Sequence, residues 1–158
     1  MFSKYVGRLQ GDWPYRAGRT PIFYGWIIAF ISTLGFLFSV PGQTMGMAVF
    51  ADAFIASFGL SRTELSAAYM LGTIGSALFL TKAGRLYDQL GARIMLTVSA
   101  LGLGCALVFI SGIDLVAQQV VRWVEVDLAI ITFPLILLGY FGVRFSGQGV
   151  MTSVSTNM

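Results

Sequence analysis

The chain has 158 residues, of which 56% are hydrophobic and 11% are charged, and its mean hydropathy is +0.80. About a quarter of the residues of an ordinary soluble domain are charged, so this composition excludes that class and predicts an integral membrane protein. Histidine is absent and Cys105 is the single cysteine. An internal disulfide is therefore excluded, and neither a metal nor a cofactor is expected.

The apolar residues form long unbroken runs, which favours an all-α polytopic fold over a β-barrel with alternating strands. A crossing needs about 20 apolar residues, so we expect four transmembrane helices in residues 23–158 after a cytoplasmic tail of residues 1–22. Their approximate bounds are 23–49, 64–82, 94–113 and 128–152.

The net charge of +3 comes from ten Lys and Arg against seven acidic residues. These cations are scattered around the predicted spans instead of forming a stripe, so they indicate topology and no nucleic-acid partner. Four cations precede the first span and three surround the loop between the second and third spans; these are Lys4, Arg8, Arg16, Arg19, Lys82, Arg85 and Arg93. The positive-inside rule therefore predicts a cytoplasmic N-terminus, in a plasma or cell inner membrane.

The first predicted span is long, and Pro41 predicts a bend in it because proline cannot continue the helical hydrogen-bond ladder. The dipeptide Gly42-Gln43 follows the proline directly and precedes Thr44. The same dipeptide recurs in the fourth span as Gly147-Gln148.

The second span begins with Ser61-Arg62-Thr63-Glu64, which has the spacing of a helix capping box. A proton-carrying role for Glu64 is the alternative, but a carboxylate so close to a cap lies at the outer interface. Within the span, Tyr69 adds a polar ring beside small residues such as Gly72 and Gly75. Helix packing explains the small residues, and Tyr69 is a candidate for contact with a substrate.

A polar segment, Gly84 to Arg93, separates the second and third spans and is expected to be a cytoplasmic loop. Near a helix N-terminus, the Asp88 carboxylate would be stabilised by the helix dipole by about 0.3–1 kcal/mol. Arg85 and Arg93 would be within reach of Asp88 or of anionic headgroups. The alternative is that these charges only anchor the loop among headgroups.

After the third span, polar residues fall on one helical stripe of the segment 113–127; they are Asp114, Gln118, Arg122 and Glu125. This pattern predicts an amphipathic connector that lies on the outer face of the membrane. Binding of a partner protein by this segment is the less favoured interpretation.

Arg144 is flanked by apolar and small residues inside the fourth span. An arginine at the centre of a membrane helix costs about 2.5–3.5 kcal/mol, so it is expected to reach the inner interface, to pair with an acid such as Asp88, or to face a water-filled cavity. In the last case its guanidinium could bind the carboxylate of an anionic substrate.

The loop Gly84-x-x-x-Asp88-x-x-Gly91-x-Arg93 resembles the signature loop of the major facilitator superfamily of secondary transporters. The resemblance extends to Tyr24-Gly25-Trp26 and to the run Arg144–Gly149, and it includes a weaker similarity to the monocarboxylate and oxalate/formate exchanger branch. It implies that Gly84 permits the close approach of a neighbouring helix and that Asp88 lies where the third helix begins. It also implies that Arg85, Asp88, Gly91 and Arg93 form a cytoplasmic gating loop.

Transporters of this kind contain inverted three-helix repeats, in which the first and fourth spans occupy equivalent places. On that basis Gln43 and Gln148 would face each other across a cavity, with Thr44 adjacent. Packing of glycine-rich helices is the competing explanation of the repeated dipeptide. The substrate-cavity candidates are Gln43, Thr44, Tyr69, Arg144 and Gln148.

The resemblance implies transport of a small solute by alternating access, with an organic anion, such as a carboxylate, as the expected substrate. Four spans are fewer than the twelve that the resemblance implies, so the chain is interpreted as the N-terminal portion of a longer transporter, with lipids, the substrate and the missing C-terminal portion as partners. No span contains a deep acidic residue for a proton relay, and no residues suggest an enzyme. The alternative is a complete small four-helix membrane protein that acts as an oligomeric scaffold or small exporter.

Overall fold

The computed structural model describes residues 23–124 and 128–157, and these ranges are helical with no strand. The predicted all-α class is therefore confirmed. The helices are α2 Tyr24–Phe38, the 3-10 helix η2 Val40–Gly42, α3 Thr44–Phe58, α4 Arg62–Leu90, α5 Ala92–Val124, α6 Leu128–Val143, the π-helix η3 Arg144–Met151 and α7 Thr152–Thr156. The predicted N-terminal tail, residues 1–22, lies outside the described residues.

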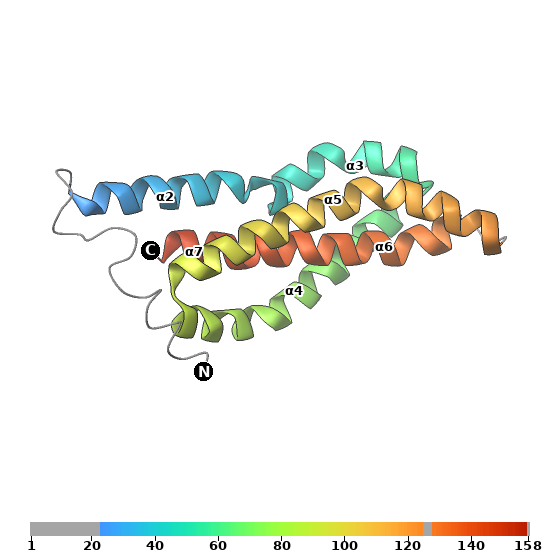
Figure 1. The fold of residues 1–158 in the computed structure, drawn as a ribbon. Coiled ribbons are helices and arrows are strands. Elements are labelled where there is room, and N and C mark those ends of the chain that lie inside the picture. Colours follow the sequence, from blue (N-terminus) through green and yellow to red (C-terminus); the bar gives the residue numbers. More distant parts are fainter. Residues whose placement is uncertain (1–22, 125–127, 158) are drawn as a thin grey trace.

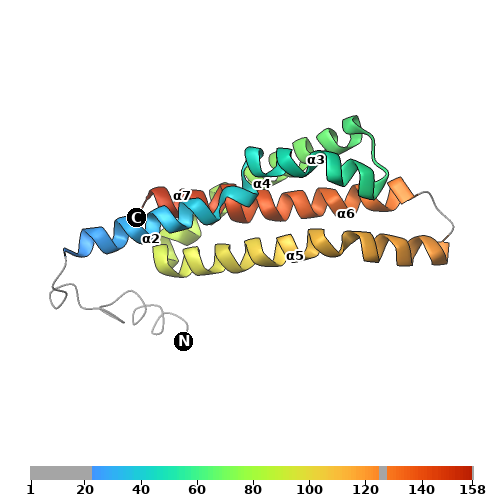
Figure 2. The same cartoon turned by 90° about the horizontal axis from the view of Figure 1, so that it is seen from above.

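The helices form an elongated bundle (Figures 1 and 2), in which α2 and α3 follow each other along one side. Helix α6 packs against both α5 and α4. The start of α2, the turn from α4 to α5 and α7 lie together at the left-hand end of Figure 1. The chain therefore traverses the length of the bundle four times in alternating directions.

Two helical stretches, Ala92–Val120 and Ala129–Thr156, are long and apolar enough to cross a membrane by length and composition. The first corresponds to the third predicted span, and the second joins α6, η3 and α7 over the fourth. The shorter α2 and α3 together cover the first predicted span, and α4 covers the second.

The predicted bend at Pro41 is present as a break between two helices. Helix α2 ends at Phe38, η2 contains Pro41, and Gln43 is extended (φ −84°, ψ 159°) before α3 begins at Thr44. The amides of Gly42 and Gln43 donate to carbonyls three residues back, at 2.9 Å each. Proline has no amide to donate, so the α-helical ladder stops here.

The capping box at the start of α4 is also confirmed. The Glu64 amide donates to Ser61 Oγ at 3.2 Å, and the Ser61 amide donates to the Glu64 carboxylate at 2.7 Å. These bonds satisfy amides that have no partner inside the helix. Just before this cap, Gly59 ends α3 in the left-handed conformation (φ 65°) that glycine adopts without strain.

The polar segment Gly84 to Arg93 differs from the predicted loop, because it is almost entirely helical. Helix α4 continues through Leu90 and α5 starts at Ala92, so Gly91 alone separates them, with φ at +80°. The segment contains no proline and is rich in good helix formers such as Leu, Arg and Gln. Asp88 consequently lies in the last turn of α4 and not at the start of the third helix, so the helix dipole does not favour its carboxylate there.

The segment 113–124 belongs to α5, whereas a separate connector was expected over 113–127; residues 125–127 lie outside the described residues. The physical reason is a continued buried stripe. Ile110, Ile113 and Ala117 are 6%, 1% and 0% exposed, at the spacing of one helix face. The sequence pattern of polar residues on the other face did not reveal this packing against α6.

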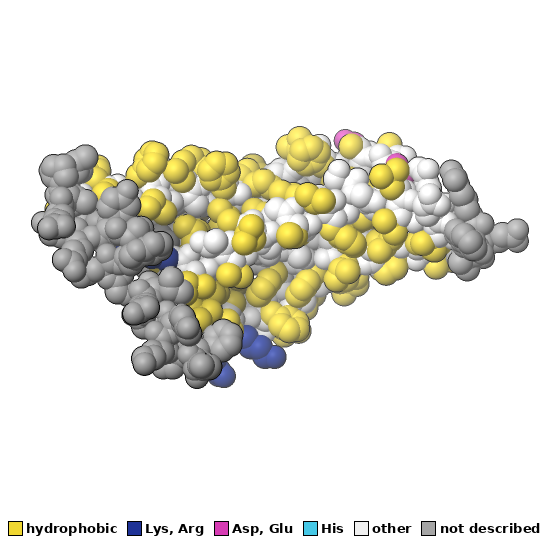
Figure 3. All heavy atoms as spheres, viewed as in Figure 1, with side chains coloured by type: hydrophobic (Ala, Val, Ile, Leu, Met, Phe, Trp, Pro, Cys, Tyr) yellow, Lys and Arg dark blue, Asp and Glu magenta, His cyan; other side chains and the backbone are white. Residues whose placement is uncertain are grey.

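The core lies where α3, α4, α5 and α6 meet, around the buried ring of Tyr140. The Tyr140 ring packs edge-on against Tyr69 with ring centroids 5.5 Å apart, and against Phe54 at 6.3 Å. Elsewhere, many large apolar side chains are exposed, among them Met45, Val49, Leu78 and Val108. Figure 3 shows this apolar surface along the bundle, with dark blue cations toward its left-hand end and magenta acids over α3.

Candidate functional site

Arg144 is the first residue of η3, and its side chain lies between α3 and α4 with 8% of its surface exposed. Its Nε donates to Thr73 Oγ1 at 3.1 Å and its Nη1 donates to Thr44 Oγ1 at 3.3 Å. Its guanidinium carbon lies 4.9 Å from the centroid of the Tyr69 ring, in cation–π geometry. We call these four residues, Arg144, Thr44, Tyr69 and Thr73, the Arg144 cluster.

The hydroxyl groups of the cluster are connected. Tyr69 donates to Thr44 Oγ1 at 2.9 Å, so this oxygen accepts hydrogen bonds from both Tyr69 and Arg144. Thr73 in turn donates to the Tyr69 carbonyl at 2.8 Å. This bond orients the Thr73 hydroxyl oxygen toward Arg144. The partners that hold the guanidinium are therefore neutral, and they come from α3 and α4.

The predicted pair of Arg144 with Asp88 is not formed. Thr73 and Asp88 are fifteen residues apart on α4, about 22 Å at 1.5 Å per residue, and Arg144 is bonded at the Thr73 level. No carboxylate of the described residues lies within ion-pair distance of Arg144. The recorded ion pair joins Arg62 to Asp52 at 2.7 Å, at the exposed turn between α3 and α4.

Arg144 also keeps unused donor capacity. A guanidinium has five N–H groups, and the two recorded bonds use Nε and Nη1. Nη2 makes no hydrogen bond to the described residues. Among these residues, the fully buried side-chain atom that lacks a hydrogen-bond partner is Ser155 Oγ, so Nη2 is not fully buried. Nη2 is therefore not sealed off from open space.

A small pocket of about 160 Å³ adjoins the cluster. Thr44 and Tyr69 form part of its wall, together with Ser66, Tyr140 and apolar residues of α3 and α4. Ligand pockets for drug-sized molecules usually have 300–1,000 Å³. This pocket would hold a solute of only a few heavy atoms.

The two Gly-Gln dipeptides do meet, but through their glycines. A Cβ added to Gly42 would lie 2.7 Å from Gly147 Cα and 2.7 Å from the Val143 carbonyl oxygen. This close backbone contact corresponds to the packing explanation of the repeat. Gln43 donates from Nε2 to the buried Ser39 Oγ at 3.1 Å, and Gln148 is exposed.

Ser39 connects the break in the first span to the end of the fourth. Its Oγ accepts from Gln43 and from Thr152 Oγ1, which lies 3.1 Å away, and donates to the Phe36 carbonyl. Thr152 Oγ1 also lies 3.1 Å from the Gly147 carbonyl, the oxygen that the Thr152 amide bonds in the π-helical turn. The break and the π-helix are thus joined by side chains as well as by the glycine contact.

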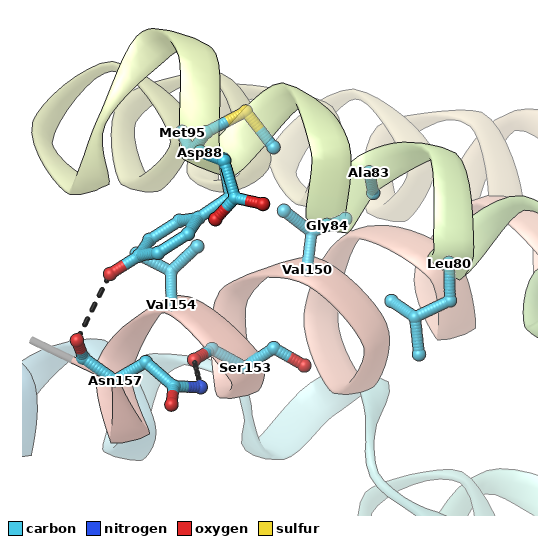
Figure 4. Close-up of a pocket in the computed structure, with 10 residues that line it drawn as sticks. Leu80, Ala83, Gly84, Asp88, Met95, Val150, Ser153, Val154 and Asn157 are labelled. Atoms are coloured by element: carbon cyan, nitrogen blue, oxygen red, sulfur yellow. Dashed lines mark hydrogen bonds between the residues drawn. The ribbon is translucent and has the colours of Figure 1, made fainter.

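A second cavity, of about 460 Å³, lies between the ends of α4 and α7 (Figure 4). Gly84 and Asp88 line it from α4, and Ser153 and Asn157 line it from the end of the chain. Nothing lies within 4 Å of a Cβ added at Gly84. The expected close approach of a helix at Gly84 is therefore absent among the described residues.

The remaining residues of the predicted gating loop lie near this cavity. Arg85 is exposed on α4, Gly91 forms the turn, and Arg93 lines an adjoining pocket of about 370 Å³ with Ile28 and Ile31 of α2. Tyr87 lines both spaces and donates to the Asn157 carbonyl at 3.0 Å. The structure thus brings the segment beside the end of the chain.

Of the five predicted cavity residues, the structure brings together Thr44, Tyr69 and Arg144. Sequence reasoning missed Thr73. A usable signal was its place four residues after Tyr69, because residues at this spacing lie on one helix face.

No family model, curated protein or solved structure matches the chain.

Proposed function

We propose that the chain is a four-span membrane protein that forms part of a larger facilitator-type secondary transporter. It carries a small organic anion by alternating access, and Arg144 binds the anion. The observation that carries this proposal is a guanidinium that is 8% exposed and is held by two hydroxyls and an aromatic ring.

Placement in a membrane is supported by the exposure of the apolar helices. Only 22% of the most apolar stretch of α5 is buried within the protein, and only 33% of the most apolar stretch of the continuous helix from α6 to α7. The core helix of a soluble protein, by contrast, is mostly buried. Helices α4 and α5 have 29 and 33 residues, about 43 and 50 Å at 1.5 Å per residue. Either length exceeds the roughly 30 Å hydrocarbon core of a bilayer.

The distribution of charge supports the same placement. Lys82, Arg85 and Arg93 lie around the turn from α4 to α5, at the end where the chain also starts α2. The acidic residues Asp52 and Glu64 lie toward the opposite end, near the turn from α3 to α4. With the cationic end in the cytoplasm, this arrangement satisfies the positive-inside rule.

The anion is supported by the electrostatics of Arg144. A buried charge is costly unless it is paired, and hydroxyl dipoles with a π-face compensate it only in part. A carboxylate at Nη2 would supply the missing opposite charge through charge-assisted hydrogen bonds. The small adjoining pocket, with its apolar wall of Met47 and Leu65, favours a short monocarboxylate.

The test is uptake of radiolabelled acetate by cells that express the native gene product, with Arg144→Lys compared with Arg62→Lys. Lysine keeps the charge but cannot bond Thr73, Thr44 and an anion through one planar fork. We expect Arg144→Lys to lower uptake at least about tenfold, the effect of losing one hydrogen bond to a charged group. Arg62→Lys should leave uptake unchanged, because Arg62 is exposed and lies outside the Arg144 cluster. Wild-type uptake in Arg144→Lys would remove Arg144 from the site.

A further inference from the structure

Thr44 is both the first residue of α3 and a hydrogen-bond partner of Arg144. We infer that Thr44 couples the binding of an anion at Arg144 to movement of α3 about the break at Val40–Gly42. This inference rests on the proposed function, since it requires that Arg144 binds an anion. It assigns to Thr44 a positioning role and to α3 the role of a gate beside the pocket.

The break has the features of a hinge. Between Phe38 and Thr44 the chain makes no α-helical turn, Pro41 removes one backbone donor, and Gln43 is extended. Hinges are a few residues at the ends of elements that absorb changes in φ and ψ. A rotation there would reorient α3 without unwinding either helix.

The residues on one side of the hinge are firmly held. Gly42 touches Gly147 through the backbone, and Ser39 is fully buried and bonded to Thr152. A backbone contact of this kind leaves no room for displacement toward η3. Helix α2 and the break therefore form the fixed side, about which α3 moves.

Helix α3 on the other side is held more loosely. Met45 and Val49 are 82% and 78% exposed. At its far end the Asp52–Arg62 ion pair is exposed on both sides, and such pairs contribute little to stability. Met47 and Phe58 are its buried anchors, so the two hydrogen bonds on Thr44 Oγ1 are the polar contacts that tie the start of α3 to η3 and α4.

An anion at the end of the guanidinium would share Nη1 with Thr44. Nε is occupied by Thr73, so a carboxylate that approaches the guanidinium end-on would use one N–H from each of Nη1 and Nη2. Nη1 now donates to the neutral Thr44 hydroxyl at 3.3 Å, a long hydrogen bond. A carboxylate adds a full opposite charge and a bidentate geometry that the neutral hydroxyl lacks, so the anion draws the guanidinium away from Thr44 and frees the start of α3. Thr44 also lines the pocket, so this movement changes access to it.

The experiment measures the distance from α3 to α6 with spin labels, in the full chain reconstituted in lipid nanodiscs. In a Cys105→Ser background, labels are placed at Val49→Cys and Leu138→Cys, two exposed positions on α3 and α6. A reference pair uses Phe30→Cys on α2 with Leu138→Cys. Binding of acetate and benzoate to the same samples is measured by calorimetry.

We expect benzoate or acetate to bind and to shift the α3 distance distribution to a second position, while the α2 reference stays fixed. Thr44→Val should populate that second position without any anion, and Thr44→Ser, which keeps the hydroxyl, should restore the wild-type distribution. Thr33→Val is the matched control, because Thr33 bonds only the Ala29 carbonyl of its own helix in the recorded contacts.

Two results overturn the inference separately from the proposed function. Binding of the acid without any movement of α3, or an unchanged distribution in Thr44→Val, would show that Thr44 couples nothing, while the anion site stands. Absence of binding by the wild-type protein would instead overturn the proposed function, and the coupling with it.

Discussion

Arg144 is placed where a cation is difficult to accommodate, and its surroundings show how the chain does so. Thr44 and Thr73 supply oxygens, Tyr69 supplies a π-face, and none of them supplies charge. Each such hydrogen bond to a charged group contributes about 1.5–3 kcal/mol. In the function that we propose, the anion would bind at the remaining donor capacity of Nη2.

Glu64 gives a prediction at the residue scale, outside the apolar part of α4. Hydrogen bonds from the Ser61 amide and hydroxyl hold the pKa of the Glu64 carboxyl below its ordinary value. A carboxyl with a lowered pKa in the folded state stabilises that state fully above its ordinary pKa, and this contribution is lost as the pH falls through the lowered value. Acidification should therefore weaken the cap.

The measurement is the thermal midpoint of the wild type and of Glu64→Gln over a series of acidic pH values. Glutamine keeps the capping geometry but does not titrate. The difference in thermal midpoint between the two proteins should be constant at pH values above the ordinary pKa range of a carboxyl group. It should change as the pH falls below that range. Identical pH profiles for both proteins would show that protonation of Glu64 does not change the stability of the protein.

At the scale of elements, the first and fourth traverses meet at their irregular points. The 3-10 helix η2 lies against the π-helix η3 through Gly42 and Gly147. Departures from the α-helix of this kind are frequent at functional sites, and here they place Arg144 and Thr44 on facing elements. The glycine contact is what allows this approach.

Gly42→Ala tests that contact. Its Cβ would lie 2.7 Å from backbone atoms that cannot rotate away, so the break and η3 must separate, at a cost of about 1–3 kcal/mol. The free energy of unfolding in an SDS titration measures the effect. Gly104→Ala is the matched control, because nothing lies within 4 Å of its added Cβ; it should stabilise α5 by about 0.5–1 kcal/mol. Equal effects of the two substitutions would contradict the close contact.

At the scale of the whole molecule, the proposed membrane placement would cover the exposed apolar surface with lipid. Cys105 provides a probe, because it is an exposed thiol well inside α5. A membrane-impermeant maleimide should fail to label Cys105 in intact cells and should label it after denaturation in SDS. Thr63→Cys in a Cys105→Ser background should be labelled in intact cells, since it lies at the turn predicted to be outside. Labelling of Cys105 in intact cells would exclude α5 from the hydrocarbon.

Hydrophobic runs, Pro41 and the Ser61 capping box predicted the helical class, the break and the start of α4, because these depend on local chemistry. The turn at Gly91 was expected as a longer loop, since charged residues on a helix end resemble a loop in sequence. The extension of α5 past residue 113 depends on packing against α6, which local pattern does not report. Thr73 was missed for the same reason, because its role depends on the approach of Arg144 from a distant helix.

The most direct test of the account is binding of radiolabelled acetate to the purified chain in nanodiscs, with Arg144→Gln compared with Arg85→Gln. Both substitutions remove one positive charge, but only Arg144 lies in the cluster. We predict that wild type and Arg85→Gln bind acetate and that Arg144→Gln loses at least about tenfold in affinity, or 1.4 kcal/mol. Equal binding by Arg144→Gln and wild type, or no binding by either, would contradict the anion site.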